Sequence, residues 1–138
     1  MLDRNPTFAK ANMVVFACAQ KGMFAEALAQ IERWRSFLDE PWNWAAQAYV
    51  YGRMGRHSEA ARALEKLRQF AGQNPSYPIT MLPVAYIGVN DKEKALASLE
   101  DLLRERIVHS SLKVDPVYDP LREDPRFQEV LRRAGLAK

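Results

Sequence analysis

Apolar residues recur along this chain three and four positions apart, which is the spacing of amphipathic α-helices. Three such stripes follow alanines, and their apolar members are Leu28, Ile31 and Trp34, then Leu64, Leu67 and Phe70, then Leu96, Leu99, Leu102 and Leu103. A further apolar stretch with helical spacing precedes each stripe, over roughly 7–21, 42–54 and 79–89. The alternation typical of β-strands does not occur. The pattern predicts an all-α fold in which the helices come in pairs.

The helix pairs recur in phase along the chain. The alanines that open the three stripes, Ala27, Ala60 and Ala95, stand 33 and 35 residues apart. Five positions before each alanine is a residue that tolerates the left-handed conformation between two helices: Gly22, Gly55 and Asn90. Short segments containing proline separate the pairs, since proline ends one helix and can open the next. The sequence therefore predicts three helix-turn-helix repeats, over about 7–38, 42–72 and 77–107.

The pattern changes after about residue 107, where three Asp-Pro pairs follow one another: Asp115-Pro116, Asp119-Pro120 and Asp124-Pro125. Asp124 can cap a helix whose first residue is Pro125. We expect this last helix to run to about Ala134 before Gly135, with Phe127, Val130, Leu131 and Ala134 on its apolar face. The tail and capping helix occupy 108–138, and the whole chain, 1–138, is expected to form a single domain.

The composition is that of a globular protein, with 48% hydrophobic and 27% charged residues. The excess of 20 Lys and Arg over 17 Asp and Glu is too small to suggest nucleic-acid binding. A single cysteine, Cys18, excludes a disulfide scaffold. Neither a signal peptide nor a stretch of the roughly 20 apolar residues that span a bilayer is present. We therefore expect a cytoplasmic protein with no membrane contact.

The residues that could carry chemistry favour a non-enzymatic role. Cys18 lies among apolar residues in a predicted helix, and His57 lies in a turn beside Arg56. His109 stands next to two serines, but nothing in the sequence supplies an orienting acid. Two histidines and one cysteine do not form a zinc site without carboxylates, and no glycine-rich phosphate loop is present. We expect no catalytic residue, no metal and no cofactor.

The helix pairs resemble tetratricopeptide repeats, which are helix-turn-helix units of about 34 residues. The residues that carry the resemblance are Trp44, Ala48, Tyr51, Gly55, Ala60 and Leu64 in the second unit, Leu82, Tyr86, Ala95 and Leu99 in the third, and Gly22, Ala27 and Ile31 in the first. The pattern departs from the family where Cys18 replaces an aromatic residue, Pro83 a small residue and Asn90 a glycine. Over about 7–107, the resemblance implies a right-handed α-solenoid of three repeats, followed by the capping helix.

The resemblance also implies a concave face, lined by the first helix of each repeat, that binds a peptide or helix of a protein partner. The family positions on this face are Asn12, Phe16, Gln20, Trp42, Tyr49, Arg53, Tyr77, Thr80 and Ile87, together with Ala45, Gly52 and Val84. Gly52 and Gly88 are expected to leave the backbone open to a closely approaching ligand. Equally, such aromatic residues can be core, or can pack on the tail or on a second subunit.

The tail is similar to the closing segment of bacterial multidomain signalling proteins and transcriptional regulators. This likeness implies a C-terminal interaction module of a larger regulator, and residues 2–6 resemble the end of a preceding repeat, so we expect a fragment. Two other functions stay open. One is a scaffold that forms a homodimer through Trp34, Trp42 or the end helices. The other is a small-molecule sensor with a pocket under Trp42, Trp44, Tyr49 and Tyr77.

Overall fold

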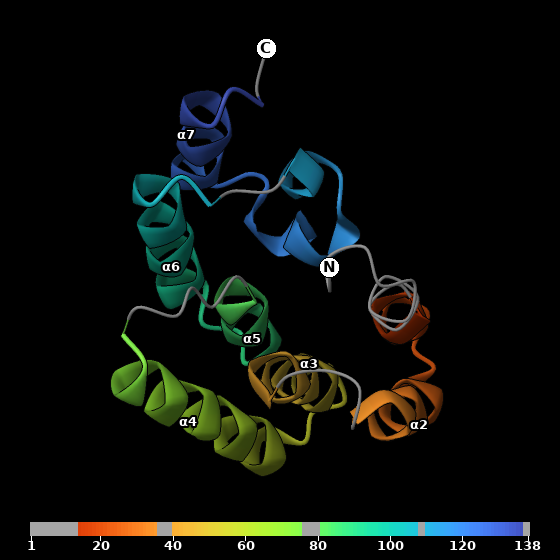
Figure 1. Cartoon of the computed structure of the whole chain (residues 1–138). Coiled ribbons are helices and arrows are strands. Elements are labelled where there is room, and N and C mark those ends of the chain that lie inside the picture. The colour runs from red at the N-terminus through yellow and green to blue at the C-terminus, as the bar shows by residue number, and fades with distance from the viewer. Residues whose placement is uncertain (1–13, 36–39, 76–80, 108–109, 137–138) are drawn as a thin grey trace.

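The computed structural model describes residues 14–35, 40–75, 81–107 and 110–136 (Figure 1). The described regular elements are all helical and contain no strand, which confirms that the fold is all-α. After a helical stretch over 14–20, they are α2 (Phe24–Trp34), α3 (Glu40–Arg53), α4 (His57–Gln73), α5 (Leu82–Gly88), α6 (Lys92–Arg104), the 3₁₀ helices η3 (Ser110–Lys113) and η4 (Pro116–Leu121), and α7 (Pro125–Arg133). None of the helices within these ranges has the length and apolar character needed to cross a membrane.

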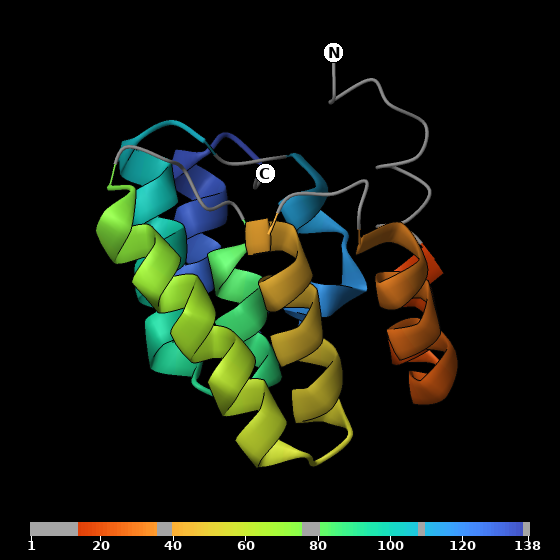
Figure 2. The same ribbon diagram turned by 60° about the horizontal axis from the view of Figure 1, so that its bottom comes forward.

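The helices pack in the order in which the sequence pairs them. Helix α3 contacts α2 before it, α4 after it and α5 beyond, and α5 in turn contacts α6. In Figures 1 and 2, α3, α4 and α5 run side by side, and α7 lies against the end of α6. Helix α5 is shorter than the predicted 79–89, because it begins at Leu82 with Pro83 in its first turn. Residues 79 and 80 lie outside the described part of the chain.

The three predicted turns share one hydrogen-bonding arrangement. Gly22, Gly55 and Asn90 all have positive φ, between 63° and 81°, as the sequence predicted. At each turn the following amide N–H donates to the carbonyl five residues back, from Met23 to Cys18, from Arg56 to Tyr51 and from Asp91 to Tyr86, at 2.8–2.9 Å. Each alanine that opens a stripe donates to the carbonyl four residues before it. The same helix ending and the same helix start therefore occur three times at the repeat spacing.

Asn90 bears the strain of a left-handed conformation that glycine adopts freely, with φ at 63°. We expect Asn90→Ala to destabilise the fold by about 1 kcal/mol and Asn90→Gly to leave it equal or more stable. Urea unfolding followed by circular dichroism measures both. An equal loss in the two variants would contradict this prediction, because only one of them adds strain at that φ.

The two glycines Gly52 and Gly88 serve a different purpose from the one predicted. They lie where α3 and α5 cross, and a Cβ on Gly52 would stand 2.5 Å from the carbonyl carbon of Gly88. A Cβ on Gly88 would stand 2.7 Å from the carbonyl oxygen of Ala48. The expectation that these glycines leave the backbone open to a ligand is therefore wrong: another helix of the same chain fills that space.

The tail folds into short helices, and Asp-Pro pairs stand at the starts of η4 and α7. The carboxylate of Asp115 accepts from the amide of Val117 at the start of η4, and that of Asp124 accepts from Arg126 at the start of α7, at 2.8 Å. The expected last helix, with its Asp124 cap, is confirmed, and it buries Phe127, Val130 and Leu131. The sequence did not predict η3 and η4.

Helix α7 is fixed to α6 by charge as well as by apolar contact. The guanidinium of Arg126 donates to Glu100 at 2.8 and 3.1 Å and to Glu93 at 2.7 Å. The hydrogen bond from Arg126 lowers the pKa of the Glu100 carboxyl. Because a lowered carboxyl pKa stabilises the fold only while the carboxyl is ionised, this contribution is lost as the pH falls through the folded-state pKa.

Candidate interaction face

The residues predicted for the concave face are mostly buried where the structure describes them. Phe16, Trp42, Tyr49 and Ile87 are all less than 10% exposed. Gln20 is half-buried and Arg53 is exposed. The remaining three, Asn12, Tyr77 and Thr80, lie outside the described residues. We use the name inner face for Phe16, Trp42, Tyr49, Val84 and Ile87, which come from the helical stretch 14–20, α3 and α5 and belong to one hydrophobic cluster.

Tyr49 is at the centre of the inner face. Its ring meets that of Phe16 edge-on, with 5.3 Å between ring centroids, and Phe16 meets Trp42 in the same way at 6.3 Å. The side-chain amide of Gln20 donates to the Tyr49 hydroxyl at 2.5 Å, and the guanidinium of Arg53 lies over the Tyr49 ring at 5.7 Å. Face residues from two different predicted repeats are thus brought together around one tyrosine.

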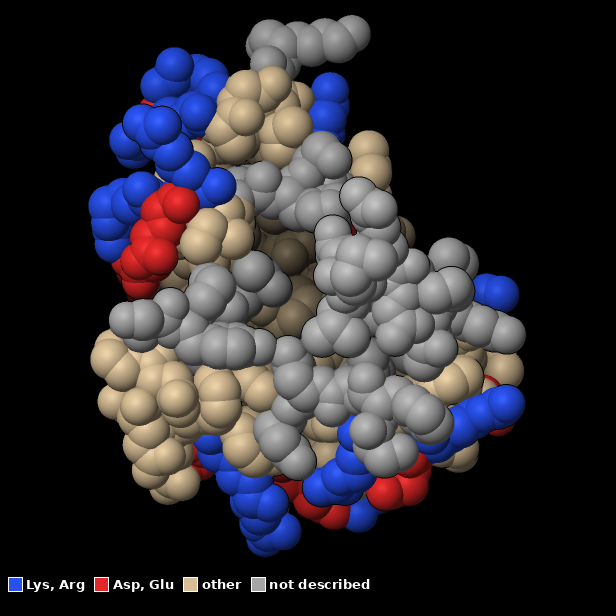
Figure 3. Space-filling model, viewed as in Figure 1, with Lys and Arg blue, Asp and Glu red and all other residues tan. Residues whose placement is uncertain are grey.

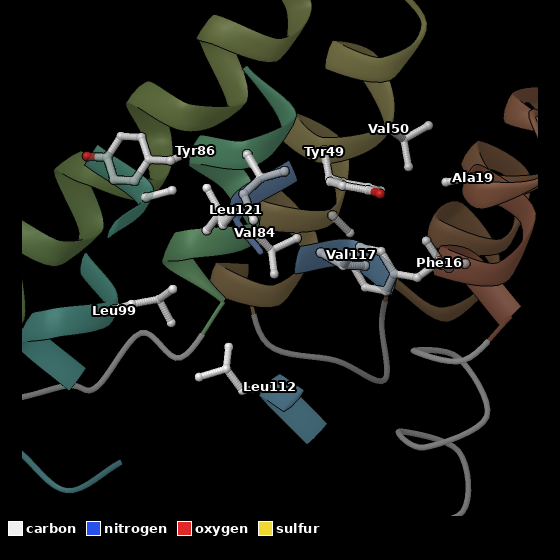
Figure 4. Close-up of a cluster of buried hydrophobic side chains, with 14 of the residues drawn as sticks. Phe16, Ala19, Tyr49, Val50, Val84, Tyr86, Leu99, Leu112, Val117 and Leu121 are labelled. Carbon is white, nitrogen blue, oxygen red and sulfur yellow. The ribbon is translucent and has the colours of Figure 1, made fainter. Parts of the chain in front are cut away.

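The chain's own tail covers the inner face. Leu112 of η3 and Val117 and Leu121 of η4 are each 3% exposed or less, and they belong to the same hydrophobic cluster as the inner face. Figure 1 shows residues 110–121, here called the tail segment, inside the curve formed by the stretch 14–20, α3, α5 and α6. Figure 4 shows Val117 between Phe16 and Val84, with Leu121 next to Val84 in this view. The face therefore holds a peptide-like segment already.

Charge is arranged around this apolar contact. Burial raises the pKa of the Tyr49 hydroxyl; the positive charge of Arg53 opposes this rise, and the carboxylates of Asp115 and Asp119 add to it. A cation of α3 and two anions of the tail segment therefore act on the same hydroxyl. In Figure 3, described charged side chains lie toward the outside of the view, while uncharged atoms are visible at the bottom of a central hollow.

The buried tyrosines predict a loss of stability at alkaline pH. Burial raises the pKa of Tyr49 and of Tyr118 of the tail segment. A raised tyrosine pKa means that its stabilising contribution is complete below the unfolded value of about 10 and declines as the pH rises further. We expect these two hydroxyls to ionise together with the loss of helical circular dichroism. The double variant Tyr49→Phe/Tyr118→Phe should keep its helices to higher pH, and unfolding at the wild-type pH would contradict this.

The other candidate sites are not assembled by the described structure. Trp44 lies in a second cluster, against Phe70 of α4, whereas Trp42 and Tyr49 lie in the first cluster and contact Phe16, so these three residues do not share one site. The Trp34 indole donates to Gln30 at 3.1 Å and lies under Arg33. Cys18 packs against the core, His57 is exposed, and His109 lies outside the described residues. Within the described ranges, no group of three His, Cys, Asp or Glu side chains could hold a metal ion.

The sequence left open that the face packs on the tail, but it did not identify the tail residues that do so. The buried residues of the tail segment are five and four positions apart, which is not the spacing of one continuous α-helix face, so a search for helical stripes passes over it. The available signal was the run of Asp-Pro pairs, since each such pair can start a short helix and bring an apolar residue back toward the body.

No protein-family model, curated protein or solved structure matches the chain.

Proposed function

We propose that this chain is a non-catalytic protein–protein interaction module that binds a peptide or helix of a partner on its inner face. The observation that carries the proposal is that the tail segment packs on this face. Two 3₁₀ helices of the tail pack into the same hydrophobic cluster as this face through Leu112, Val117 and Leu121. Aromatic residues and arginine, here Phe16, Tyr49 and Arg53, are common among the residues that dominate binding energy at interfaces.

The proposal includes the architecture that the tetratricopeptide resemblance implies, a right-handed α-solenoid of three repeats closed by a capping helix. Two features support it. The turns at Gly22, Gly55 and Asn90 repeat one set of hydrogen bonds at the spacing of the repeats. The contacts of α3 with both α4 and α5 are those of a first helix that touches its own partner and the next repeat. Such an array stacks its first helices into one continuous face.

We further propose that the module forms the C-terminal part of a larger bacterial regulatory protein. The support is the similarity of the tail, with its three Asp-Pro pairs, to the closing segment of such regulators. In this role the module turns over no substrate, and its contribution is to bring a partner to the effector domain.

A capture experiment with matched charge reversals tests the binding function. The immobilised chain is compared with Arg53→Glu, at the edge of the inner face, and with Arg62→Glu, on an exposed position of α4. We expect a protein from a cell lysate of the source organism to bind the wild type and Arg62→Glu but not Arg53→Glu. Each bound protein is identified by mass spectrometry and retested in purified form. No capture, or equal capture by both variants, would contradict binding at this face.

A further inference from the structure

We infer that the inner face selects a partner segment with the chemistry of the tail segment, and that the tail segment occupies the face until such a partner replaces it. The expected partner segment carries three apolar side chains, five and four positions apart, with acidic residues between them. This inference rests on the proposed function and adds to it the chemical class of the partner and the event that exposes the face.

The apolar pattern follows from how the tail segment is held. Leu112, Val117 and Leu121 are its deeply buried aliphatic residues, whereas Val114, between the first two, is 73% exposed. Burial of one aliphatic side chain contributes about 1.5–3 kcal/mol, so three such anchors supply most of the attraction for a short segment. A partner segment must carry apolar side chains at these three positions, whereas any side chain is tolerated at the position of Val114.

The acidic pattern follows from the charge next to Tyr49. Arg53, which is exposed and lies over the Tyr49 ring, contributes a positive charge to this edge of the face. The tail segment carries Asp115 and Asp119 between its apolar anchors; the Asp115 carboxylate accepts from the Val117 amide and that of Asp119 from Arg122, and both negative charges raise the pKa of the Tyr49 hydroxyl. Opposite charges across an interface favour the correct partner and exclude basic ones. Acidic residues between the apolar anchors therefore suit this face.

The tail segment is organised by its own hydrogen bonds, which allows it to leave the face as a unit. The guanidinium of Arg122 donates to the carbonyls of Lys113 and Asp115 at 2.7 and 2.6 Å, and to the carboxylate of Asp119 at 2.7 Å. These bonds close the turn of the segment on itself. Release of the segment breaks the contacts of Tyr118 and Arg122 with Phe127 of α7, whereas α7 itself stays attached to α6 through Arg126.

Hydrogen exchange on the unmodified full chain tests whether the segment can leave. The amides of Tyr118 and Arg122 donate to carbonyls within the segment and report its opening. We expect their protection factors to be at least about tenfold lower than those of the buried amides of α3 and α5, because the segment opens without global unfolding. Equal protection in the segment and in these helices would overturn the inference.

A peptide-binding experiment tests the chemistry. The variant Leu112→Ser/Val117→Ser/Leu121→Ser exposes the face, and a fluorescent peptide with the sequence of residues 110–123 is titrated against it. We expect binding at least about tenfold tighter than to the wild type, whose tethered segment competes at high effective concentration. A peptide with serine at the three anchors should not bind. If the triple variant loses its helical circular dichroism, Leu121→Ser alone takes its place. Absence of binding to a folded variant, or equal binding of the serine peptide, would overturn the inference.

The two proposals can fail separately. Capture of a partner that depends on Arg53, without binding of the tail peptide, would leave the interaction function standing and reject the tail-like partner. Binding of the tail peptide with no partner captured through Arg53 would support the exchangeable segment and contradict the interaction function.

Discussion

Replacing Gly88 by alanine is expected to destabilise the protein by about 3 kcal/mol, a large share of the 5–15 kcal/mol that holds a typical domain folded. The added Cβ would stand 2.7 Å from the carbonyl oxygen of Ala48 and closer still to the Cα of Tyr49. Both are backbone atoms of α3, so no side-chain rotation relieves the overlap, and α3 and α5 must separate. Gly52→Ala is expected to act similarly, because its Cβ meets the backbone of Gly88.

Gly72 provides a matched control for this prediction. It lies in α4, and a Cβ added there meets nothing within 4 Å. Gly72→Ala is therefore expected to stabilise the protein by about 0.5–1 kcal/mol, through the higher helix propensity of alanine. Chemical denaturation of the three variants measures these changes. A Gly88→Ala variant within about 0.5 kcal/mol of the wild type would show that α3 and α5 do not cross in contact.

Truncating Phe127 to alanine is expected to destabilise the protein by about 3–5 kcal/mol. The side chain is fully buried in α7, its ring stacks on that of Tyr118 with 6.2 Å between centroids, and the Arg122 guanidinium lies over it at 5.8 Å. The change leaves a cavity where the capping helix meets the tail segment. Since both then lose packing, the inner face loses part of its cover as well.

The conservative variant Phe127→Leu separates packing from other effects, because it keeps most of the apolar volume. We expect it to cost less than about 1.5 kcal/mol. Thermal unfolding followed by circular dichroism, together with the fluorescence of a dye that binds exposed apolar surface, measures both variants. A Phe127→Ala variant as stable as Phe127→Leu would mean that α7 does not form part of the core.

The sequence predicted correctly those structural features that depend on residues close together in the chain. The positive φ of Gly22, Gly55 and Asn90 and the Asp124 cap depend on residues a few positions apart, and all four were predicted. The periodic stripes likewise identified the helices, since one face of each must be apolar to be buried. Boundaries were less certain where proline intervenes, as at Pro83, which is tolerated only in the first turn of α5.

Features that depend on distant parts of the chain were not predictable in the same way. The glycine pair Gly52 and Gly88 could admit a ligand or a helix, and only the crossing of α3 and α5 distinguishes the two. The predicted face was likewise assigned through the family resemblance, which says nothing of this chain's tail. Leu112, Val117 and Leu121 lack a regular period, so the sequence pattern does not show that they join the hydrophobic cluster of Phe16 and Val84.

The seating of the tail segment on the inner face can be measured directly by nuclear Overhauser effects in the full chain. With methyl groups labelled, we expect cross-peaks from the methyls of Val117 and Leu121 to the aromatic protons of Phe16 and Tyr49, together with ring-current shifts of those methyls. Val114, which is exposed on the same segment, serves as the control and should show neither. Random-coil shifts for Val117 and Leu121, with no cross-peak to either ring, would contradict the covered face on which both proposals depend.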